Sequence, residues 1–183
     1  MERTSSEFYV ITGGPGAGKT TLVEELSRLG FRIVPEEGRK IIIEQAAAGG
    51  EALPWLNKKL FADLMFDASV TSYRKLKEIA GTETVFFDRG ILDTIGYLQL
   101  ENIPVPQEME IRAREMAYNK VIFILPPWKD IYENDLERKQ TFEVAVSTFE
   151  CMKKIYTDYG YTVVEVPKAK VGVRAGFILD RIR

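Results

Sequence analysis

The 183 residues of the chain suffice for one domain with a sizeable core, and we expect residues 1–183 to form a single domain. The 25 basic and 27 acidic side chains give a formal net charge of −2, so no overall basic field is available to recruit nucleic acid. No segment approaches the roughly 20 uninterrupted apolar residues of a membrane span, and the first ten residues contain no apolar run typical of a secretory signal, so we expect a cytoplasmic protein.

Cysteine and histidine usage narrows the chemistry further. The single cysteine, Cys151, excludes an intramolecular disulfide. The chain has no histidine, which excludes imidazole catalysis and metal sites ligated by histidine. A general base must therefore be Asp or Glu, and a bound metal must be held by oxygen ligands, as Mg²⁺ is.

The first predicted elements are a strand, a glycine-rich loop and a helix. Residues 7–12 have the apolar character of a strand, and residues 21–29 show helical periodicity that ends at Gly30. Between them, residues 13–20 have the complete pattern G-x-x-x-x-G-K-[ST] of a phosphate-binding loop. A strand, this loop and a helix place a phosphate at a helix N-terminus, where the helix dipole favours it.

Each residue type in the loop has a chemical role. Glycine permits backbone torsions at which successive N–H groups converge on one anion. The Lys19 ammonium can reach the β- and γ-phosphates, and the Thr20 hydroxyl can take a coordination position on Mg²⁺. The residues expected to bind the nucleotide here are Gly13, Gly14, Pro15, Gly16, Ala17, Gly18, Lys19, Thr20 and Thr21.

Two glutamates follow the second predicted strand, which spans residues 31–34. Glu36 and Glu37 precede a predicted helix over residues 39–48. Either carboxylate can serve as a general base, and both also suit the first turn of a helix, where the dipole stabilises acids. We prefer Glu36 as the base, because it shares a helix face with Arg39 if the helix begins there.

A long helix is predicted over residues 58–80, and the third strand is predicted over residues 84–87. An acidic and a basic residue, Asp88 and Arg89, follow this strand. An Asp at a strand end beside a phosphate loop can hold Mg²⁺ directly or through water, and Asp88 is therefore the second expected metal ligand. The alternative role for Asp88 is a helix cap. The planar donor fork of Arg89 suits a phosphate, whereas a surface ion pair is the alternative.

The remaining elements continue the alternation of strands and helices. They are predicted helices over 91–101 and 107–118, a strand over 121–125, a mostly helical segment over 128–159, a strand over 161–166 and a helix over 169–182. Five short apolar strands separated by helices predict an α/β fold of three layers, in which a parallel sheet is covered on both faces. Ligands of such sheets bind at the carboxyl ends of the strands.

Taken together, the motifs resemble P-loop kinase-type NTPases. Within that group the chain resembles small bacterial predicted ATPases of the AAA type, which are similar to the nicotinamide riboside kinase domain of bacterial NAD-salvage regulators. The residues that carry the resemblance lie at 13–20, 36–39, 87–90 and 125–128. The Glu36 and Arg39 spacing matches the riboside kinases, whereas the Asp88-Arg89 pair is more similar to deoxynucleoside and thymidylate kinases.

The resemblance implies roles for further residues. It implies that Glu36 accepts the proton of the attacking hydroxyl and that Arg89 contacts the substrate or the moving phosphoryl group. It also implies a helical lid around residues 128–142, whose Arg138 and Lys139 close on the phosphates, although a solvated helix of mixed charge fits the same residues. The loop that contains Lys168 would pack against the adenine, or it is simply a turn that contains proline.

The function expected from these observations is an ATP- and Mg²⁺-dependent phosphotransferase for a small hydroxyl-bearing, nucleoside-like acceptor, whose identity stays open. The alternative is an ATPase whose nucleotide state switches a protein partner, itself unknown. A GTPase is disfavoured because Asn119-Lys120 precedes a strand and position 122 is Ile, which breaks the guanine-binding pattern. The acidic balance disfavours a nucleic-acid module, and the lack of a separate helical domain after the fifth strand disfavours a hexameric motor.

Overall fold

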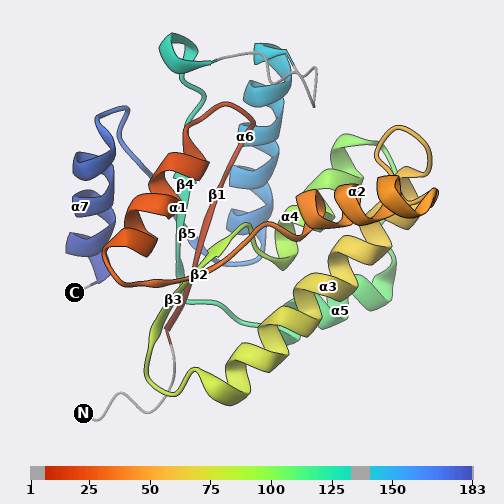
Figure 1. Cartoon of the computed structure of the whole chain (residues 1–183), viewed down its shortest axis with the longest axis horizontal. Helices are drawn as coiled ribbons and strands as arrows, with labels where there is room; N and C mark the ends of the chain where they lie inside the picture. The colour runs from red at the N-terminus through yellow and green to blue at the C-terminus, as the bar shows by residue number, and fades with distance from the viewer. Residues whose placement is uncertain (1–6, 133–140, 183) are drawn as a thin grey trace.

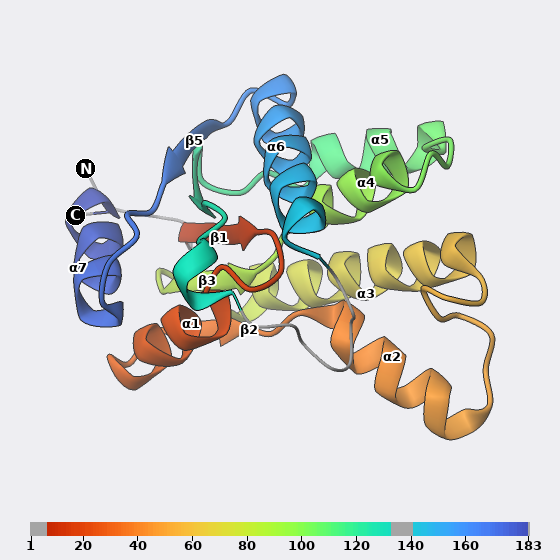
Figure 2. The same cartoon turned by 90° about the horizontal axis from the view of Figure 1, so that it is seen from above.

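The computed structural model describes residues 7–132 and 141–182, which contain a five-stranded sheet with helices on both of its faces (Figures 1 and 2). The strands are β1 (Glu7–Gly13), β2 (Arg32–Val34), β3 (Thr84–Asp88), β4 (Val121–Leu125) and β5 (Thr162–Glu165). Their order is β2-β3-β1-β4-β5, and every neighbouring pair is parallel. The predicted α/β fold is therefore confirmed.

Seven α-helices and one short 3₁₀ helix occur in the described residues. They are α1 (Lys19–Arg28), α2 (Glu37–Ala48), α3 (Lys58–Ile79), α4 (Ile91–Leu100), α5 (Gln107–Glu115), η1 (Lys129–Ile131), α6 (Phe142–Asp158) and α7 (Val171–Ile182). Among these helices, none has the length and apolar character needed to cross a bilayer.

The alternation of side chains along β1 divides the core into two layers. Phe8 and Val10 point to one face, where they pack with buried residues of α3, α4, α5 and α6. Tyr9 and Ile11 point to the other face, where they pack with α1 and α7. Figure 2 shows this arrangement, with α1 and α7 on one side of the sheet and the larger group of helices on the other. Strand β1 is thus packed on both faces, and the phosphate loop follows its carboxyl end.

Helix α2 is packed differently from the others. Of its residues only Gly38 and Ile41 are buried, and it packs against α3 rather than against the sheet. In Figure 2 it lies beside α3 and extends away from the strands. Its N-terminus nevertheless follows β2 directly, so Glu36 and Glu37 stand at the carboxyl edge of the sheet.

Most predicted boundaries agree with the structure within two residues, and two do not. The helix predicted over residues 107–118 ends at Glu115, because Met116 and Tyr118 turn into the core instead of continuing the helix. The Tyr118 hydroxyl accepts a hydrogen bond from the Ile91 N–H at 3.1 Å, which ties this loop to the start of α4. The apolar periodicity of the segment predicted the helix correctly as far as Glu115, but the residues after it pack into the core without forming a last helical turn.

The mostly helical segment predicted over residues 128–159 is the second difference. Trp128 has an extended backbone, η1 provides only three helical residues, and the long helix begins at Phe142. Two prolines at 126 and 127 precede this stretch and favour extended geometry at residues 125 and 126. Residues 133–140 lie outside the described part, and the expected lid residues Arg138 and Lys139 fall among them.

Candidate active site

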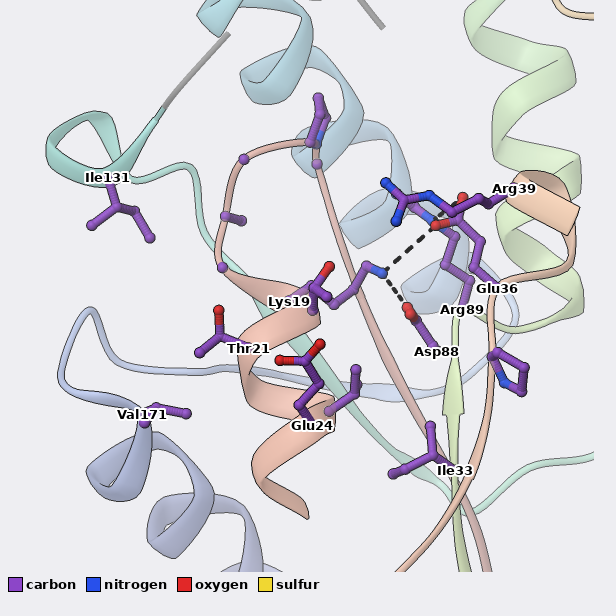
Figure 3. Close-up of a pocket in the computed structure, with 18 of the residues that line it drawn as sticks. Lys19, Thr21, Glu24, Ile33, Glu36, Arg39, Asp88, Arg89, Ile131 and Val171 are labelled. Carbon is purple, nitrogen blue, oxygen red and sulfur yellow. Dashed lines mark hydrogen bonds and ion pairs between the residues drawn. The ribbon is translucent and has the colours of Figure 1, made fainter. Parts of the chain in front are cut away.

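The register of the sheet brings the predicted site residues to one edge. Ile11 of β1 pairs with Asp88 of β3, and Gly13 pairs with Leu125 of β4. The phosphate loop that follows Gly13 therefore lies between the ends of β3 and β4. It forms the floor of a cleft of about 1320 Å³, part of which is drawn in Figure 3. Residues 14–21 all line this cleft.

Three glycines of the loop have backbone conformations that other residues rarely adopt, and the first of them, Gly13, has φ 146°. Gly16 has φ 69° and Gly18 has φ 75°, both in the left-handed region. Gly18 is also the residue that precedes α1, and a Cβ at this position would stand 2.9 Å from a guanidinium nitrogen of Arg174. Glycine at 18 is thus favoured by its torsion, and it places the N-terminus of α1 at the cleft, where an anion is favoured.

Lys19 lies buried at the centre of the cleft. Its ammonium forms an ion pair with Asp88, and its Nζ is 4.0 Å from Oε2 of Glu36, as Figure 3 shows. Burial and the neighbouring Arg89 lower the pKa of Lys19, while Asp88 and Glu36 act in the opposite direction. The next residues, Thr20 and Thr21, are exposed to the cleft.

The structure separates the roles of the two glutamates after β2. Oε1 of Glu36 is 3.2 Å from Nε of Arg89, so Glu36 lies between Arg89 and Lys19. Glu37 instead accepts a hydrogen bond from the hydroxyl of Ser72 on α3. In Figure 3, Arg39 lies beside Glu36 and Arg89. Glu36 is thus the glutamate that faces the cationic centre of the cleft.

Arg89 is held in an uncommon backbone conformation. Its φ is 71°, and its N–H donates to the carbonyl of Ile11 at 2.9 Å. The guanidinium is paired with Glu36 and with Asp93, the latter at 3.3 Å. Burial alone would lower the pKa of Arg89, but Glu36, Asp93 and Asp88 raise it beyond its ordinary value. Arg89 is therefore a fixed, permanently charged group at the cleft rather than a surface arginine.

Asp93 organises this region, although the sequence analysis did not single it out. Its buried carboxylate accepts hydrogen bonds from the Thr12 hydroxyl, from the Gly90 N–H at 2.9 Å and from the Tyr156 hydroxyl at 2.7 Å, besides its contact with Arg89. The position of Asp93 in the first turn of α4 is a signal for capping that the sequence does contain. Its link to Tyr156 of α6 is tertiary.

Arg174 of α7 is the second residue that sequence reasoning missed. Its Nη1 donates to the Gly18 carbonyl at 3.0 Å, and its guanidinium lies 5.9 Å from the centre of the Trp128 ring. The wall of the cleft beside it is formed by residues 169–171. The predicted base-binding residue Lys168 is exposed and is not among the described residues that line the cleft.

A second cleft of about 1020 Å³ adjoins the first. Its walls come from α2, α3, α4 and α6. The two clefts share the lining residues Pro15, Pro35, Glu36, Glu37, Arg39, Ile43, Asp88 and Arg89. A group bound on the phosphate loop and a molecule in the second cleft would therefore meet at Glu36, Asp88 and Arg89.

Comparisons with known proteins agree with this fold. A family model described as AAA domain matches residues 8–174. No curated protein matches the chain in sequence. Among solved structures, the chain is similar to deoxyadenosine kinase from M. mycoides with bound dATP, with a TM-score of 0.57 and 19% identity over 96% of this chain and 98% of that one.

Two further structures are similar. One is the NadR protein in complex with NR, with a TM-score of 0.71 and 21% identity over 98% of this chain and 51% of NadR. The other is thymidylate kinase from Ehrlichia chaffeensis, with a TM-score of 0.65 and 14% identity over 98% of this chain and 100% of that chain. At these identities the likeness establishes a shared fold.

Proposed function

The chain belongs to the AAA domain family, and we propose that it is an ATP- and Mg²⁺-dependent phosphotransferase that acts on a small hydroxyl-bearing, nucleoside-like metabolite. One observation carries this proposal: a cleft built on a phosphate loop and a second cleft meet at Glu36, Asp88 and Arg89. A phosphoryl donor and an acceptor need such an arrangement, because the transferred group must be in contact with both. The kinase fold of the similar structures supports the same reading.

The first cleft suits a nucleoside triphosphate. The loop and the N-terminus of α1 would bind the phosphates, with Lys19 as the fixed cation among them. The base would lie toward Trp128, Arg174 and residues 169–171, which form the opposite part of the wall. The guanidinium of Arg174 also contacts Gly18, so the base-binding side and the phosphate-binding side of the cleft are joined by one residue.

The protein oxygens near the phosphate loop fit Mg²⁺. Among the described residues, no group of three acidic or cysteine side chains is arranged to hold a metal without help. Mg²⁺ is commonly bound by one or two protein oxygens together with substrate phosphates and waters, a role that Thr20 and Asp88 can fill. When bound, Mg²⁺ would neutralise charge that develops on the phosphates.

The proposed transfer breaks the bond between the γ-phosphorus and the bridging oxygen of ATP while a bond forms from the acceptor oxygen to that phosphorus. ADP leaves, and the acceptor proton passes to Glu36. Lys19 and Arg89 would stabilise the charge on the moving group by position alone. We retain Arg138, and Lys139 beside it, as the proposed basic lid residues, although both lie outside the described residues.

The second cleft distinguishes this proposal from an ATPase switch, which needs no pocket for an acceptor. The test is a metabolite screen that follows ADP formation and the mass of the acceptor, with Lys19→Met as the control variant. We expect one class of hydroxyl compounds to accelerate ADP formation and to gain a phosphoryl group. ATP hydrolysis that no metabolite accelerates, but that a protein partner changes, would replace the kinase proposal by the switch.

A further inference from the structure

We infer that the second cleft takes a neutral or cationic acceptor with a flat aromatic ring, rather than one that already carries a phosphate or carboxylate group. The inference rests on the proposed function and narrows its substrate class. Two independent properties of the cleft support it, namely the balance of its charges and the apolar side chains at its distal end.

The described residues that line the second cleft carry more negative than positive charge. Five of them are acidic and three are basic. Lys58 forms an ion pair with Glu101, and Arg89 is paired with Glu36 and Asp93. Arg39, the third base, also takes part in an interaction. Lys58 and Arg89 are therefore not available to a new anion without first losing an acidic partner.

An anionic acceptor would meet an unfavourable field in such a cleft. Binding a phosphate of the acceptor near Lys58 would require Lys58 to give up Glu101, whose carboxylate would then stay beside the new anion. Glu37 adds a further negative group whose described partner, Ser72, is neutral. A neutral acceptor avoids this repulsion, and a cationic one is attracted.

The end of the cleft distant from the phosphate loop is apolar and aromatic. Phe61 and Tyr97 form an edge-to-face pair with ring centres 5.6 Å apart at 83°. Trp55 lines the same cleft with 60% of its side chain exposed, and Leu100 is partly exposed there as well. A flat ring bound here would cover these side chains, which is how aromatic ligands are usually held.

One polar atom near this aromatic end is available for recognition. The buried hydroxyl of Tyr97 has no hydrogen-bond partner among the described residues, an uncommon state for a buried hydroxyl. A ring that carries a hydrogen-bonding edge would satisfy it. The acceptor would then lie with its ring at Phe61 and Tyr97 and with its reacting hydroxyl at Glu36.

The two tryptophans of the chain allow the test to read each cleft separately. Trp55 lines the second cleft and Trp128 lines the first, and the sequence has no other tryptophan. In Trp128→Phe, the emission of Trp55 reports the second cleft. The probes are matched sets of one ribonucleoside, its 5′-monophosphate and a cationic N-alkylated form, for a purine and for a pyrimidine base.

We expect the neutral or cationic member of at least one set to bind about tenfold more tightly than the monophosphate at low ionic strength, which corresponds to about 1.4 kcal/mol. Equal or tighter binding of the monophosphate in both sets would overturn the inference. Tyr97→Phe, which removes only the hydroxyl, should weaken the binding of the preferred probe. An unchanged affinity in this variant would remove the role of Tyr97.

Two variants of the ion pair between Lys58 and Glu101 test the charge argument in opposite directions. Glu101→Gln frees Lys58 and should shift the preference several-fold toward the monophosphate, whereas Lys58→Gln should shift it away. Both side chains are partly exposed, so neither change threatens the core. An unchanged preference in both variants contradicts the charge argument.

The same probes in an ADP-formation assay separate two kinds of failure. If a monophosphate is the preferred phosphoryl acceptor, the inference is wrong and the proposed kinase function stands. If no probe of either charge accelerates ADP formation, the proposed function fails and the inference fails with it.

Discussion

Lys19 of the phosphate loop and Asp88 at the end of β3 form an ion pair across the floor of the nucleotide cleft. The two residues come from different strand–loop units, and the register of β1 and β3 places them together. In the proposed reaction each has a separate ligand, a phosphate for Lys19 and Mg²⁺ for Asp88. Binding of ATP and Mg²⁺ would therefore exchange one internal ion pair for two contacts with the ligand.

Lys19→Met should weaken ATP binding by about 100-fold, because it removes a charged donor to the phosphates. The fold should persist, since the Lys19 ammonium makes charged contacts within the cleft rather than apolar contacts in the core. Calorimetry measures the affinity, and circular dichroism follows the fold. Removing one partner leaves Asp88 without its cation, so the double variant Lys19→Met/Asp88→Asn is the stability control. An ATP affinity equal to that of the wild type would refute the role of the loop.

Asp88→Asn should raise the Mg²⁺ concentration for half-maximal activity by about tenfold or more, because the amide keeps the shape of the side chain and loses its charge. Saturating Mg²⁺ should then restore much of the activity. The measurement is a Mg²⁺ titration of wild type and variant at fixed ATP. Identical activation curves would leave Asp88 with a structural role through Lys19 alone.

Glu36→Gln should reduce phosphorylation of the acceptor by about 10²–10⁴-fold while ATP affinity changes much less, because the amide cannot take a proton. Glu37→Gln is the matched control, since Glu37 bonds Ser72 instead of Lys19 or Arg89. Single-turnover phosphorylation measures both variants. A loss below about threefold in Glu36→Gln would remove Glu36 as the base, as a loose transition state permits.

Arg174→Met should weaken ATP binding by about tenfold, because it removes both the hydrogen bond to the Gly18 carbonyl and the cation beside Trp128. Lys168→Met provides the comparison, because it removes a positive charge that is outside the cleft. Affinities for ATP and for inorganic triphosphate separate the base from the phosphates. If Lys168→Met weakens ATP binding more than Arg174→Met does, the expectation that the loop with Lys168 packs against the adenine is supported instead.

The thiol of Cys151 should react slowly in the native protein. Burial raises the pKa of this thiol, and Asp93 acts in the same direction against Lys154. At about pH 8.5 the native thiolate fraction is therefore smaller than in the unfolded chain, and a disulfide reagent should react several-fold faster after unfolding in urea. Because the pKa of the thiol is higher in the folded protein than in the unfolded chain, the contribution of Cys151 to stability is present below its ordinary pKa and is lost at higher pH. The variant Cys151→Ala should lack this pH dependence.

The sequence predicted the sheet and the phosphate loop because both depend on local signals. Short apolar runs set the strands, and glycines at fixed positions set the loop, so Asp88 and Lys19 could be placed at the same edge in advance. The choice between Glu36 and Glu37 stayed open, because both precede the same helix and only the position of α3 turns Glu37 toward Ser72.

The missed residues depend on contacts that are distant in sequence. Arg174 bonds a carbonyl 156 positions earlier, and Asp93 bonds hydroxyls from β1 and α6. The helix predicted over 128–159 was wrong for residues 128–132, where the composition is typical of a helix but Trp128 is extended and only a three-residue 3₁₀ helix follows. Local sequence patterns therefore predicted the phosphate loop, but not Arg174 and Asp93, whose side chains form hydrogen bonds with the loop and with the strand before it.

The sparse packing of α2 has a consequence for how the site opens. The backbone N–H groups of Arg89 and Gly90 bond Ile11 and buried Asp93, so their hydrogen exchange should require unfolding of the core. Amides of α2, with two buried residues in the whole helix, should exchange through local opening. The site thus joins a slowly exchanging half to a rapidly exchanging one. Glu36, at the N-terminus of α2, stands at the boundary of the two halves, where its ion pairs with Arg89 and Lys19 join them.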